Sequence, residues 1–270
     1  MERILSPAKL NLGLWLLGKR SDGYHEIFTI YHTVSVFDEI FIKEGPLKVE
    51  TSTGIPMEKN LVYKGIRIME KRLGKELNFQ VYIKKNIPEG AGLGGGSSNL
   101  ATVMKGINEL LGEPFTLEEL ISMAADISSD APFFLVGGSA VGRGRGEILQ
   151  KINLPPMTFT IVHPRVSCST SYVYSRVSEK MLTRNLKGDK IVDYLRAGNF
   201  SLLENKLGEL AAELYPEVGE ALRFLRSLGL QALVSGSGSS VYYIGEPQPE
   251  VRTACQLRGW KLYRAESYGV

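Results

Sequence analysis

The feature that most constrains the fold is a glycine-rich segment between a strand pattern and a helix pattern. Residues 88–98 read Pro-Glu-Gly-Ala-Gly-Leu-Gly-Gly-Gly-Ser-Ser. Because glycine has no Cβ, consecutive backbone N–H groups in this segment can approach an anion closely. Ser97 and Ser98 stand at the predicted N-cap of a helix whose apolar residues recur from Leu100 to Leu111. A helix N-terminus favours negative charge, so the segment predicts a phosphate site, with a purely structural turn as the alternative.

Neither common nucleotide motif is complete in the glycine segment. Gly90, Gly92 and Gly95 have dinucleotide-motif spacing, but that motif needs an acidic residue about 20 positions on, after a second strand. Helix and turn are predicted in that region instead. The P-loop motif is also incomplete, because no Gly-Lys-Ser or Gly-Lys-Thr follows the glycines. The glycines therefore indicate phosphate binding without identifying the ligand.

Length and composition indicate a globular protein with two domains. The 270 residues are 43% hydrophobic, and 32 basic against 29 acidic residues leave a net charge of +3. This balance argues against a nucleic-acid partner. Cys168, Cys255 and three histidines predict neither a disulfide framework nor a metal site. With no recognisable signal sequence or membrane span, we expect a cytoplasmic protein with no membrane partner.

Strand and helix patterns are mixed without a regular βαβα alternation, which predicts an α+β fold. Strand patterns cover residues 4–17, 27–36, 38–42, 79–83, 158–162, 232–234, 241–244 and 261–265. Helix patterns cover residues 61–73, 99–111, 190–196, 202–214 and 251–257, a segment through Tyr174, and segments after Thr116, Asp130 and Pro216. A Pro-Pro break at residues 155–156 places a domain boundary nearby.

Two positions outside the glycine segment have side chains suited to chemistry. Lys9 and Asn11 lie two residues apart in a strand pattern, so their side chains point to the same face. Asp130 precedes a helix with Pro132 in its first turn, which makes it a good N-cap. From these patterns alone, Asp130 could be only a cap and Lys9 only a solvated strand residue.

Three stretches together resemble the GHMP kinase superfamily, and within it the 4-diphosphocytidyl-2-C-methyl-D-erythritol kinase family. The first joins residues 6–12, Ser-Pro-Ala-Lys-Leu-Asn-Leu, with residues 18–25, Gly-Lys-Arg-Ser-Asp-Gly-Tyr-His. The glycine segment and residues 234–238, Val-Ser-Gly-Ser-Gly, resemble the superfamily at large. The resemblance implies an α+β, two-domain GHMP kinase-like fold with the active site in the inter-domain cleft. It implies an N-terminal ATP-binding domain at residues 1–152 and a C-terminal domain at residues 153–270.

The implied activity is that of a small-molecule kinase in the non-mevalonate route to isoprenoid precursors. ATP would phosphorylate the 2-hydroxyl group of 4-diphosphocytidyl-2-C-methyl-D-erythritol, with Mg²⁺ expected but its ligands unidentified. The partner would be a small molecule carrying a cytidine diphosphate group, and the protein a monomer or weak homodimer. One alternative is another GHMP kinase acting on mevalonate, homoserine or a sugar. Another is a non-catalytic nucleotide- or RNA-binding protein that uses Arg143, Arg145 and Lys151.

The resemblance also implies roles for individual residues. Lys9 and Asp130 would be the catalytic pair. The ATP-binding residues would be Pro88, Glu89, Gly90, Ala91, Gly92, Leu93, Gly94, Gly95, Gly96, Ser97 and Ser98. The substrate-binding residues would be Asn11, Tyr24, His25, Tyr31, Thr170 and Tyr174, with a third motif formed by Ser235, Gly236, Ser237 and Gly238.

The chain departs from the superfamily pattern in two places. Its glycine segment ends in Gly-Leu-Gly-Gly-Gly-Ser-Ser-Asn, whereas Gly-Leu-Gly-Ser-Ser-Ala is common in the superfamily. This difference leaves open which of Ser97 and Ser98 approaches Mg²⁺. Tyrosine also stands at positions 31 and 174, where phenylalanine is expected, and it adds hydroxyl groups that need partners.

Overall fold

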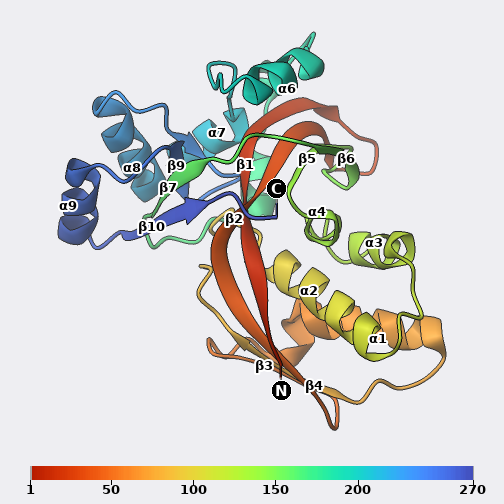
Figure 1. Cartoon of the computed structure of the whole chain (residues 1–270). Helices are drawn as coiled ribbons and strands as arrows, with labels where there is room; N and C mark the ends of the chain where they lie inside the picture. The colour runs from red at the N-terminus through yellow and green to blue at the C-terminus, as the bar shows by residue number, and fades with distance from the viewer. Residues whose placement is uncertain (1, 270) are drawn as a thin grey trace. The chain divides into compact units, whose positions relative to one another are not determined.

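The computed structural model describes residues 2–269, which form two compact units (Figure 1). The described part of unit 1 comprises residues 2–8, 36–87 and 94–137. That of unit 2 comprises residues 9–35, 88–93 and 138–269. Each unit therefore draws on separate stretches of the chain. The predicted division into domains at residues 1–152 and 153–270 stays a prediction.

Helices and strands are mixed along the chain, which confirms the predicted α+β class. The strands are β1 (Glu2–Lys19), β2 (His25–Glu44), β3 (Lys48–Thr51), β4 (Phe79–Lys84), β5 (Ser139–Arg143), β6 (Ile148–Ile152), β7 (Thr158–His163), β8 (Leu233–Val234), β9 (Val241–Ile244) and β10 (Lys261–Glu266). The α-helices are α1 (Leu61–Leu73), α2 (Gly95–Leu110), α3 (Leu117–Ala125), α4 (Ala131–Val136), α5 (Thr170–Ser175), α6 (Gly188–Arg196), α7 (Lys206–Leu214), α8 (Pro216–Ser227) and α9 (Pro249–Arg258). Short 3-10 helices lie at Met57–Lys59 and Glu179–Met181.

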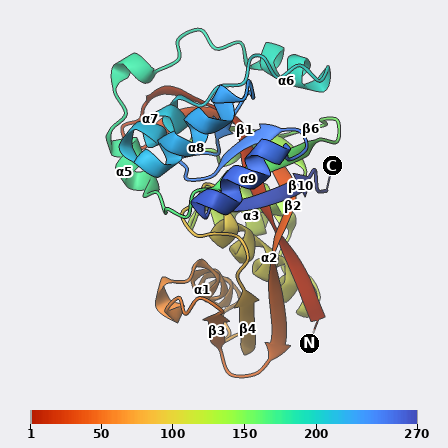
Figure 2. The same cartoon turned by 90° about the vertical axis from the view of Figure 1, so that its left-hand side faces the viewer.

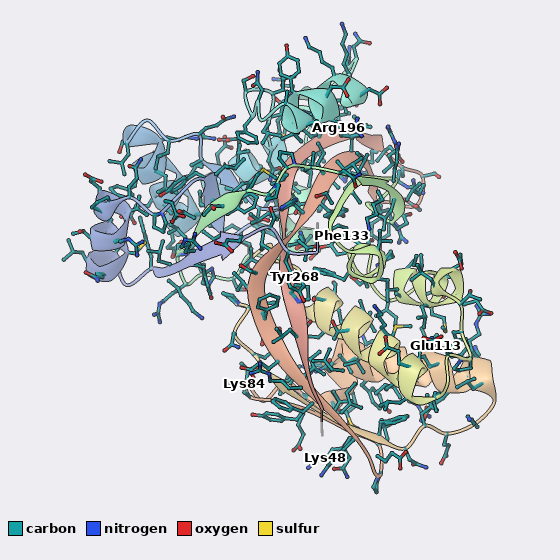
Figure 3. All side chains as sticks on the ribbon, in the orientation of Figure 1. Lys48, Lys84, Glu113, Phe133, Arg196 and Tyr268 are labelled. Carbon is teal, nitrogen blue, oxygen red and sulfur yellow. The ribbon has the colours of Figure 1, made fainter. Side chains whose placement is uncertain are left out.

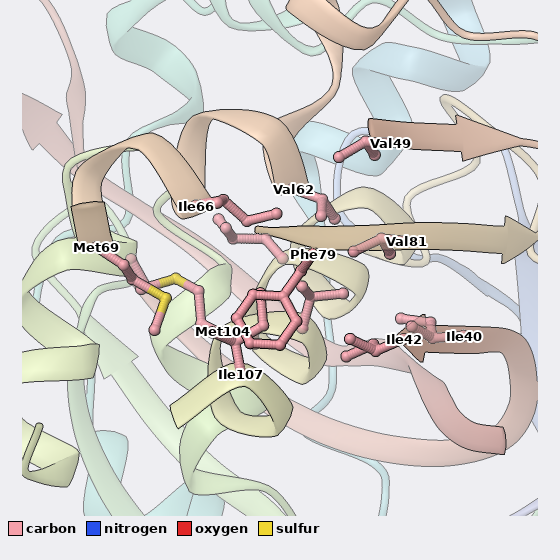
Figure 4. Close-up of a cluster of buried hydrophobic side chains, with 14 of the residues drawn as sticks. Ile40, Ile42, Val49, Val62, Ile66, Met69, Phe79, Val81, Met104 and Ile107 are labelled. Carbon is pink, nitrogen blue, oxygen red and sulfur yellow. The ribbon is translucent and has the colours of Figure 1, made fainter. Parts of the chain in front are cut away.

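Unit 1 packs helices against one face of a sheet. The second half of β2 pairs antiparallel with β4, and β3 runs parallel to β4. Alternate residues of β4, namely Phe79, Val81 and Ile83, are buried in a core shared with α1 and α2, as the period of two predicts (Figure 4). Each large apolar side chain buried in this way contributes about 1.5–3 kcal/mol. This core holds the start of α2, where the glycine segment ends.

Unit 2 contains an antiparallel sheet with the strand order β10-β7-β9-β8. Helices α8 and α9 lie beside this sheet (Figures 1 and 2). Their apolar residues share a buried core with Val162, Val234 and Val241 from the sheet. The first half of β2 pairs with β5, and β5 pairs with β6. A smaller core joins β1, α5 and α7. Unit 2 thus brings β1 and the β8–β9 turn, which holds the third motif, into one body.

Several helix ends follow the predicted sequence signals. The Asn60 side chain accepts a hydrogen bond from Val62 N–H at the start of α1, and Gly74 ends that helix with a φ of 67°. Thr116 and Glu119 form the predicted capping box of α3. Asp130 occupies the N-cap position of α4. These signals are local, so the sequence alone is enough to place them.

Other predicted boundaries were wrong. Helix α2 begins at Gly95, because Gly94 adopts a φ of 71° as its N-cap, and Ser97 and Ser98 therefore lie in the first turn. Strand β2 is continuous from His25 to Glu44, where two strands were predicted. Helix α7 begins at Lys206 rather than at residue 202, because the Asn205 side chain caps it.

His32 of β2 is fully buried between two serine hydroxyl groups. Its Nδ1 lies 2.8 Å from Ser139 Oγ, and its Nε2 lies 2.7 Å from Ser267 Oγ. Residues next to Ser267 also bond to β2, since Tyr268 (Figure 3) donates its N–H to the Thr33 carbonyl at 3.0 Å. His32 therefore helps to hold the C-terminal residues around Ser267 against β2 within unit 2. Burial lowers the pKa of His32 from 6.5 to about 4.

The lowered pKa of His32 predicts acid sensitivity with a defined sign. The stability that neutral His32 contributes is fully present above pH 6.5 and is lost as the pH falls through about 4. We expect His32→Gln to reduce the slope of unfolding free energy against pH in this window, because glutamine does not titrate, while His163, whose pKa is also lowered to about 4, keeps part of the slope. Urea unfolding at a series of pH values measures it. Equal pH slopes in the two proteins would contradict this role of His32.

Candidate active site

Lys9 of β1 lies inside unit 2, although its side chain is polar. The residue is 3% exposed, and its Nζ donates to Asn11 Oδ1 at 2.5 Å. The predicted sharing of one strand face by Lys9 and Asn11 is therefore confirmed. Lys9 Nζ also lies 5.6 Å from the centre of the Tyr31 ring. A buried positive charge needs such partners, and these contacts fix the direction of the Lys9 side chain.

Asn11 connects Lys9 to the third motif and to β2. Its Nδ2 donates to Thr29 Oγ1 at 2.8 Å, so its Oδ1 is turned toward Lys9. Its backbone N–H donates to Ser235 Oγ at 3.2 Å, and the Ser235 hydroxyl donates to the Gly92 carbonyl at 2.9 Å. Three of the predicted site regions thus meet at one serine side chain of unit 2.

The first part of the glycine segment, residues 88–93, packs tightly against other backbone of unit 2. Gly92 has a φ of +73°, and a Cβ on it would lie 2.0 Å from the Ser235 carbonyl oxygen. The Leu93 carbonyl accepts from Lys9 N–H at 3.0 Å, and the Ala91 carbonyl accepts from Ser240 N–H at 3.0 Å. Close backbone packing therefore requires glycine at position 92. Pro88 and Glu89 lie at more exposed positions of the same segment.

The second part of the glycine segment forms the start of α2 in unit 1, and its two serines have different partners. Ser98 is fully buried, and its Oγ lies 2.8 Å from Ser6 Oγ. Ser97 Oγ lies 2.7 Å from Ser128 Oγ instead. Gly95 and Gly96 precede these serines in the first turn of the helix. Ser98 therefore makes a hydrogen bond inside the core of unit 1, while Ser97 is hydrogen-bonded to Ser128, two residues before Asp130.

Asp130 is half-buried at the N-cap of α4, but its side chain makes no capping hydrogen bond. Its backbone N–H donates to Ser128 Oγ at 3.3 Å, which places the Asp130 backbone next to the Ser97–Ser128 pair. Capping alone therefore does not explain an aspartate here. Among residues 2–269, no group of three His, Cys, Asp or Glu side chains could hold a metal ion by itself.

Aromatic side chains occur at the start of β2 and in α5, and one pair of them is in contact. The His25 and Tyr174 rings are stacked, with centroids 5.5 Å apart and planes inclined at 28°. Tyr24 is 54% exposed, and the guanidinium of Arg145 lies 4.9 Å from its ring centre. Burial and Lys19 lower the pKa of His25, so its neutral form is favoured. These rings offer flat surfaces of the kind on which a nucleobase stacks.

Two other predicted substrate-binding residues occupy different environments. Tyr31 is 1% exposed and lies under Lys9 Nζ, with Gly142 and Gly146 packed against its ring. Thr170 is exposed at the start of α5, and its Oγ1 lies 2.8 Å from Ser237 Oγ of the third motif. Thr170 is thus joined to the third motif within unit 2, whereas Tyr31 is buried beneath Lys9.

The sequence did not indicate some residues that hold this region together. Tyr242 donates its hydroxyl to the Asn11 carbonyl at 3.0 Å, and burial raises the pKa of that phenol. Asn205 donates to two carbonyls around the third motif. In the sequence, Asn205 could have been recognised only as the N-cap residue of a helix. Because the helix was predicted to start at residue 202, Asn205 was placed inside it and this role was missed.

Two protein families match separate parts of the chain. Residues 60–138 match the GHMP kinases N terminal domain, and this range includes the whole glycine segment and Asp130. Residues 191–257 match the GHMP kinases C terminal family, which includes the third motif. Together the matches cover regions of both described units.

Named relatives are similar along nearly the whole chain. The 4-diphosphocytidyl-2-C-methyl-D-erythritol kinase of Sulfurihydrogenibium sp. is 46% identical over 98% of this chain and 99% of its own length. That of Persephonella marina is 44% identical over 98% of both chains. A crystal structure of 4-(cytidine 5'-diphospho)-2C-methyl-D-erythritol kinase matches with a TM-score of 0.84 and 33% identity, covering 99% of this chain and 100% of that one. The homoserine kinase from Cytophaga hutchinsonii matches at a TM-score of 0.72 and 20% identity over 98% and 94% of the two chains, which shows a shared fold alone.

Proposed function

This chain belongs to the 4-diphosphocytidyl-2-C-methyl-D-erythritol kinase family of the GHMP kinases, and we propose that it phosphorylates the 2-hydroxyl group of that cytidyl compound. It is a small-molecule kinase, and ATP is the phosphoryl donor. In the proposed reaction, the acceptor oxygen forms a bond to the γ-phosphorus of ATP. The bond from that phosphorus to the β,γ-bridging oxygen breaks, and ADP leaves. The product would feed the non-mevalonate route to isoprenoid precursors.

The observation that carries this proposal is the position of Lys9 beside the third motif. A Cβ on Gly236 would lie 3.6 Å from Lys9 Nζ and 3.0 Å from Asn11 Oδ1, so glycine keeps the backbone close to both groups. Phosphoryl transfer needs mainly positioning and stabilisation of negative charge. Lys9 supplies a buried, oriented cation for that purpose. We assign it the role of stabilising the transferring phosphoryl group.

Asp130 is proposed as the residue that accepts or orients the proton of the acceptor hydroxyl group. Its side chain makes no capping hydrogen bond, so helix capping does not account for an aspartate at this position. Its backbone is linked through Ser128 to Ser97 in the glycine segment. The proton would pass from the acceptor oxygen to Asp130 as the new bond to phosphorus forms.

The residues of unit 1 fit a Mg²⁺ ion that is held mainly by ATP. In kinases this ion uses one or two carboxylates together with phosphate oxygens and water, rather than a complete protein cage. Ser97 is the glycine-segment serine whose hydroxyl is hydrogen-bonded to the segment before Asp130, and it would supply one oxygen ligand while the Asp130 carboxylate serves the acceptor hydroxyl. When bound, the ion would neutralise charge on the phosphates. We therefore favour Ser97 over Ser98 at this site.

The acceptor's cytosine is proposed to bind at the aromatic side chains of unit 2. Tyr24 and Tyr174 would stack on the base, and His25 would bond to its edge. Base stacking contributes about 1–3 kcal/mol per aromatic ring, enough to separate a cytidyl acceptor from a smaller alcohol. The neutral state of His25 favoured by its lowered pKa gives the ring one donor and one acceptor for this task.

Two buried thiols support a reducing, cytoplasmic compartment for the protein. Cys168 and Cys255 are both buried and form no disulfide. Burial raises the pKa of Cys168 to about 12 and that of Cys255 to about 11, so both remain protonated near neutral pH. Protonated, buried thiols are poor nucleophiles and are not placed for redox chemistry.

An acceptor panel tests the proposed function. The full chain is incubated with ATP and Mg²⁺, and ADP release is measured with the cytidyl compound, mevalonate, homoserine and a sugar. We expect turnover with the cytidyl compound alone, because only that acceptor carries a base for the aromatic side chains. A phosphorylated product is identified by mass spectrometry. Strong turnover with another acceptor and none with the cytidyl compound would overturn the proposal.

A further inference from the structure

We propose that Asn205 is a positioning residue for this kinase, which holds the third motif in place beside Lys9. The inference rests on the proposed function and names a residue outside the motifs that the family resemblance identified. Asn205 stands immediately before α7 and is 2% exposed. It acts through the backbone of the third motif.

Every hydrogen-bonding group of the Asn205 side chain has a defined partner in unit 2. Its Nδ2 donates to the Val234 carbonyl at 2.8 Å and to the Gly236 carbonyl at 2.7 Å. Its Oδ1 accepts from Gly208 N–H at 2.9 Å. The preceding residue is tied to β1, because the Glu204 carbonyl accepts from Leu14 N–H at 2.9 Å. The Asn205 amide therefore holds the backbone carbonyls on both sides of Ser235 against the start of α7.

The two carbonyls that Asn205 holds belong to the part of the third motif that faces Lys9. Gly236 has a φ of +56°, and its missing Cβ would point toward Asn11 Oδ1 and Lys9 Nζ. Between the two carbonyls, Ser235 bonds to Asn11 N–H and to the Gly92 carbonyl. Any shift of this backbone therefore changes the surroundings of Lys9. Misplacement of reacting groups by 1 Å can cost about 100-fold in rate.

The N-cap role of Asn205 does not account for both of its donors. Capping uses only Oδ1, and aspartate or serine would cap α7 about as well. Only the amide nitrogen satisfies the two carbonyls. A Cβ on Gly208 would lie 2.7 Å from Asn205 Nδ2 and 2.7 Å from Val234 Cβ, so the packing leaves no space for a substitute donor. The two hydrogen bonds from Nδ2 to backbone carbonyls around the third motif thus explain why asparagine stands at this position.

The variant Asn205→Asp separates positioning from capping. It keeps the shape and the cap but replaces both donors with an oxygen that faces two carbonyl oxygens. We expect kcat to fall at least ~10-fold while the KM for ATP stays within about twofold of wild type. Hydrogen exchange should also become faster in residues 233–241, where Gly238 N–H and Ser240 N–H are bonded in the wild type. Asn205→Ser, which also caps but adds no charge, serves as the second variant.

Asn108→Asp is the matched control. Asn108 is 6% exposed in α2 of unit 1, donates to the Phe115 carbonyl at 3.0 Å, and accepts from Phe115 N–H at 3.0 Å. It lies 13 residues after Gly95, which is about 20 Å along the helix. The substitution at Asn108 therefore makes the same amide-to-carboxylate change in a buried side chain that is remote from the glycine segment. We expect kcat within about twofold of wild type and unchanged exchange in residues 233–241.

The outcomes distinguish this inference from the proposed function. Absence of wild-type turnover with the cytidyl compound would overturn the function, and the exchange rates would still decide the role of Asn205. Wild-type turnover with kcat retained in both Asn205 variants would overturn the positioning role. An equal loss of kcat in Asn108→Asp would do the same, because it would show a general effect of destabilisation. Melting temperatures of all variants confirm that the assay temperature lies below unfolding.

Discussion

Replacing Asp130 with asparagine is expected to lower kcat at least ~100-fold, the usual contribution of a positioned acid–base group. Asparagine has nearly the same shape but cannot accept the proton of the acceptor hydroxyl. The fold should be retained, because asparagine has nearly the same volume as aspartate and the N–H of residue 130 would still donate to Ser128 Oγ. Steady-state ADP release at saturating ATP and acceptor measures kcat, and the melting temperature checks the fold.

Asp126→Asn is the control for Asp130→Asn. Asp126 is an exposed aspartate at the C-cap of α3 in the same unit, and its substitution removes the same charge. Its kcat should equal that of wild type within about twofold, since surface substitutions have small effects. If Asp130→Asn retains kcat within about tenfold of wild type, Asp130 has a supporting role and the proposed proton transfer is wrong.

Removing the Asp38 carboxylate is expected to cost about 3–5 kcal/mol of unfolding free energy, the usual result of breaking a buried ion pair. Asp38 is fully buried in unit 1 and pairs with Lys85, whose side chain is 4% exposed. It also accepts from Asn86 N–H at 2.6 Å, Ile87 N–H at 2.8 Å and Asn99 Nδ2 at 2.9 Å. Asp38→Ala would leave these donors and the Lys85 charge without their acceptor. Urea unfolding at pH 7 measures the loss.

The neighbouring residue Glu39 provides the control for Asp38→Ala. Glu39 pairs with Lys84 at 3.0 Å on the outer side of the sheet, where the Lys84 side chain is 54% exposed (Figure 3). Glu39→Ala should leave the unfolding free energy nearly unchanged, because solvent screens such a pair. A loss below about 1 kcal/mol for Asp38→Ala would show that the surrounding polar groups replace the carboxylate, contrary to this expectation.

Features that depend on neighbouring residues could be predicted from the sequence. The caps of α1 and α3 follow from local side-chain chemistry, and the burial of alternate residues in β4 follows from the period of a strand. Strands β3, β5 and β6 were missed because they are short: β3 and β5 pair with strands distant in the chain, and β6 pairs only with the neighbouring β5, which was itself not predicted. Their formation depends on tertiary pairing more than on local propensity.

The site was predictable only where a motif held several of its residues. Lys9 and Asn11 could be placed on one face because strand geometry fixes that relation. The contacts of Asn205 with the third motif span 29 and 31 residues, and that of Ser128 with Ser97 spans 31, so no local pattern reveals them. Burial of Tyr31 likewise depends on Gly142 of β5, a strand that was not predicted, and on Gly146 of the turn that follows it.

The course of β1 and β2 through both units limits how this protein can be dissected. Each strand begins in one unit and ends in the other, and the glycine segment also crosses from unit 2 to unit 1 between Leu93 and Gly94. No single cut therefore yields a fragment that contains all of one unit and none of the other. A truncated expression product that begins at residue 153 would lack residues 9–35, and with them the parts of β1 and β2 that belong to unit 2. Circular permutation between exposed loops, rather than excision of a domain, is the rational way to reorganise this chain.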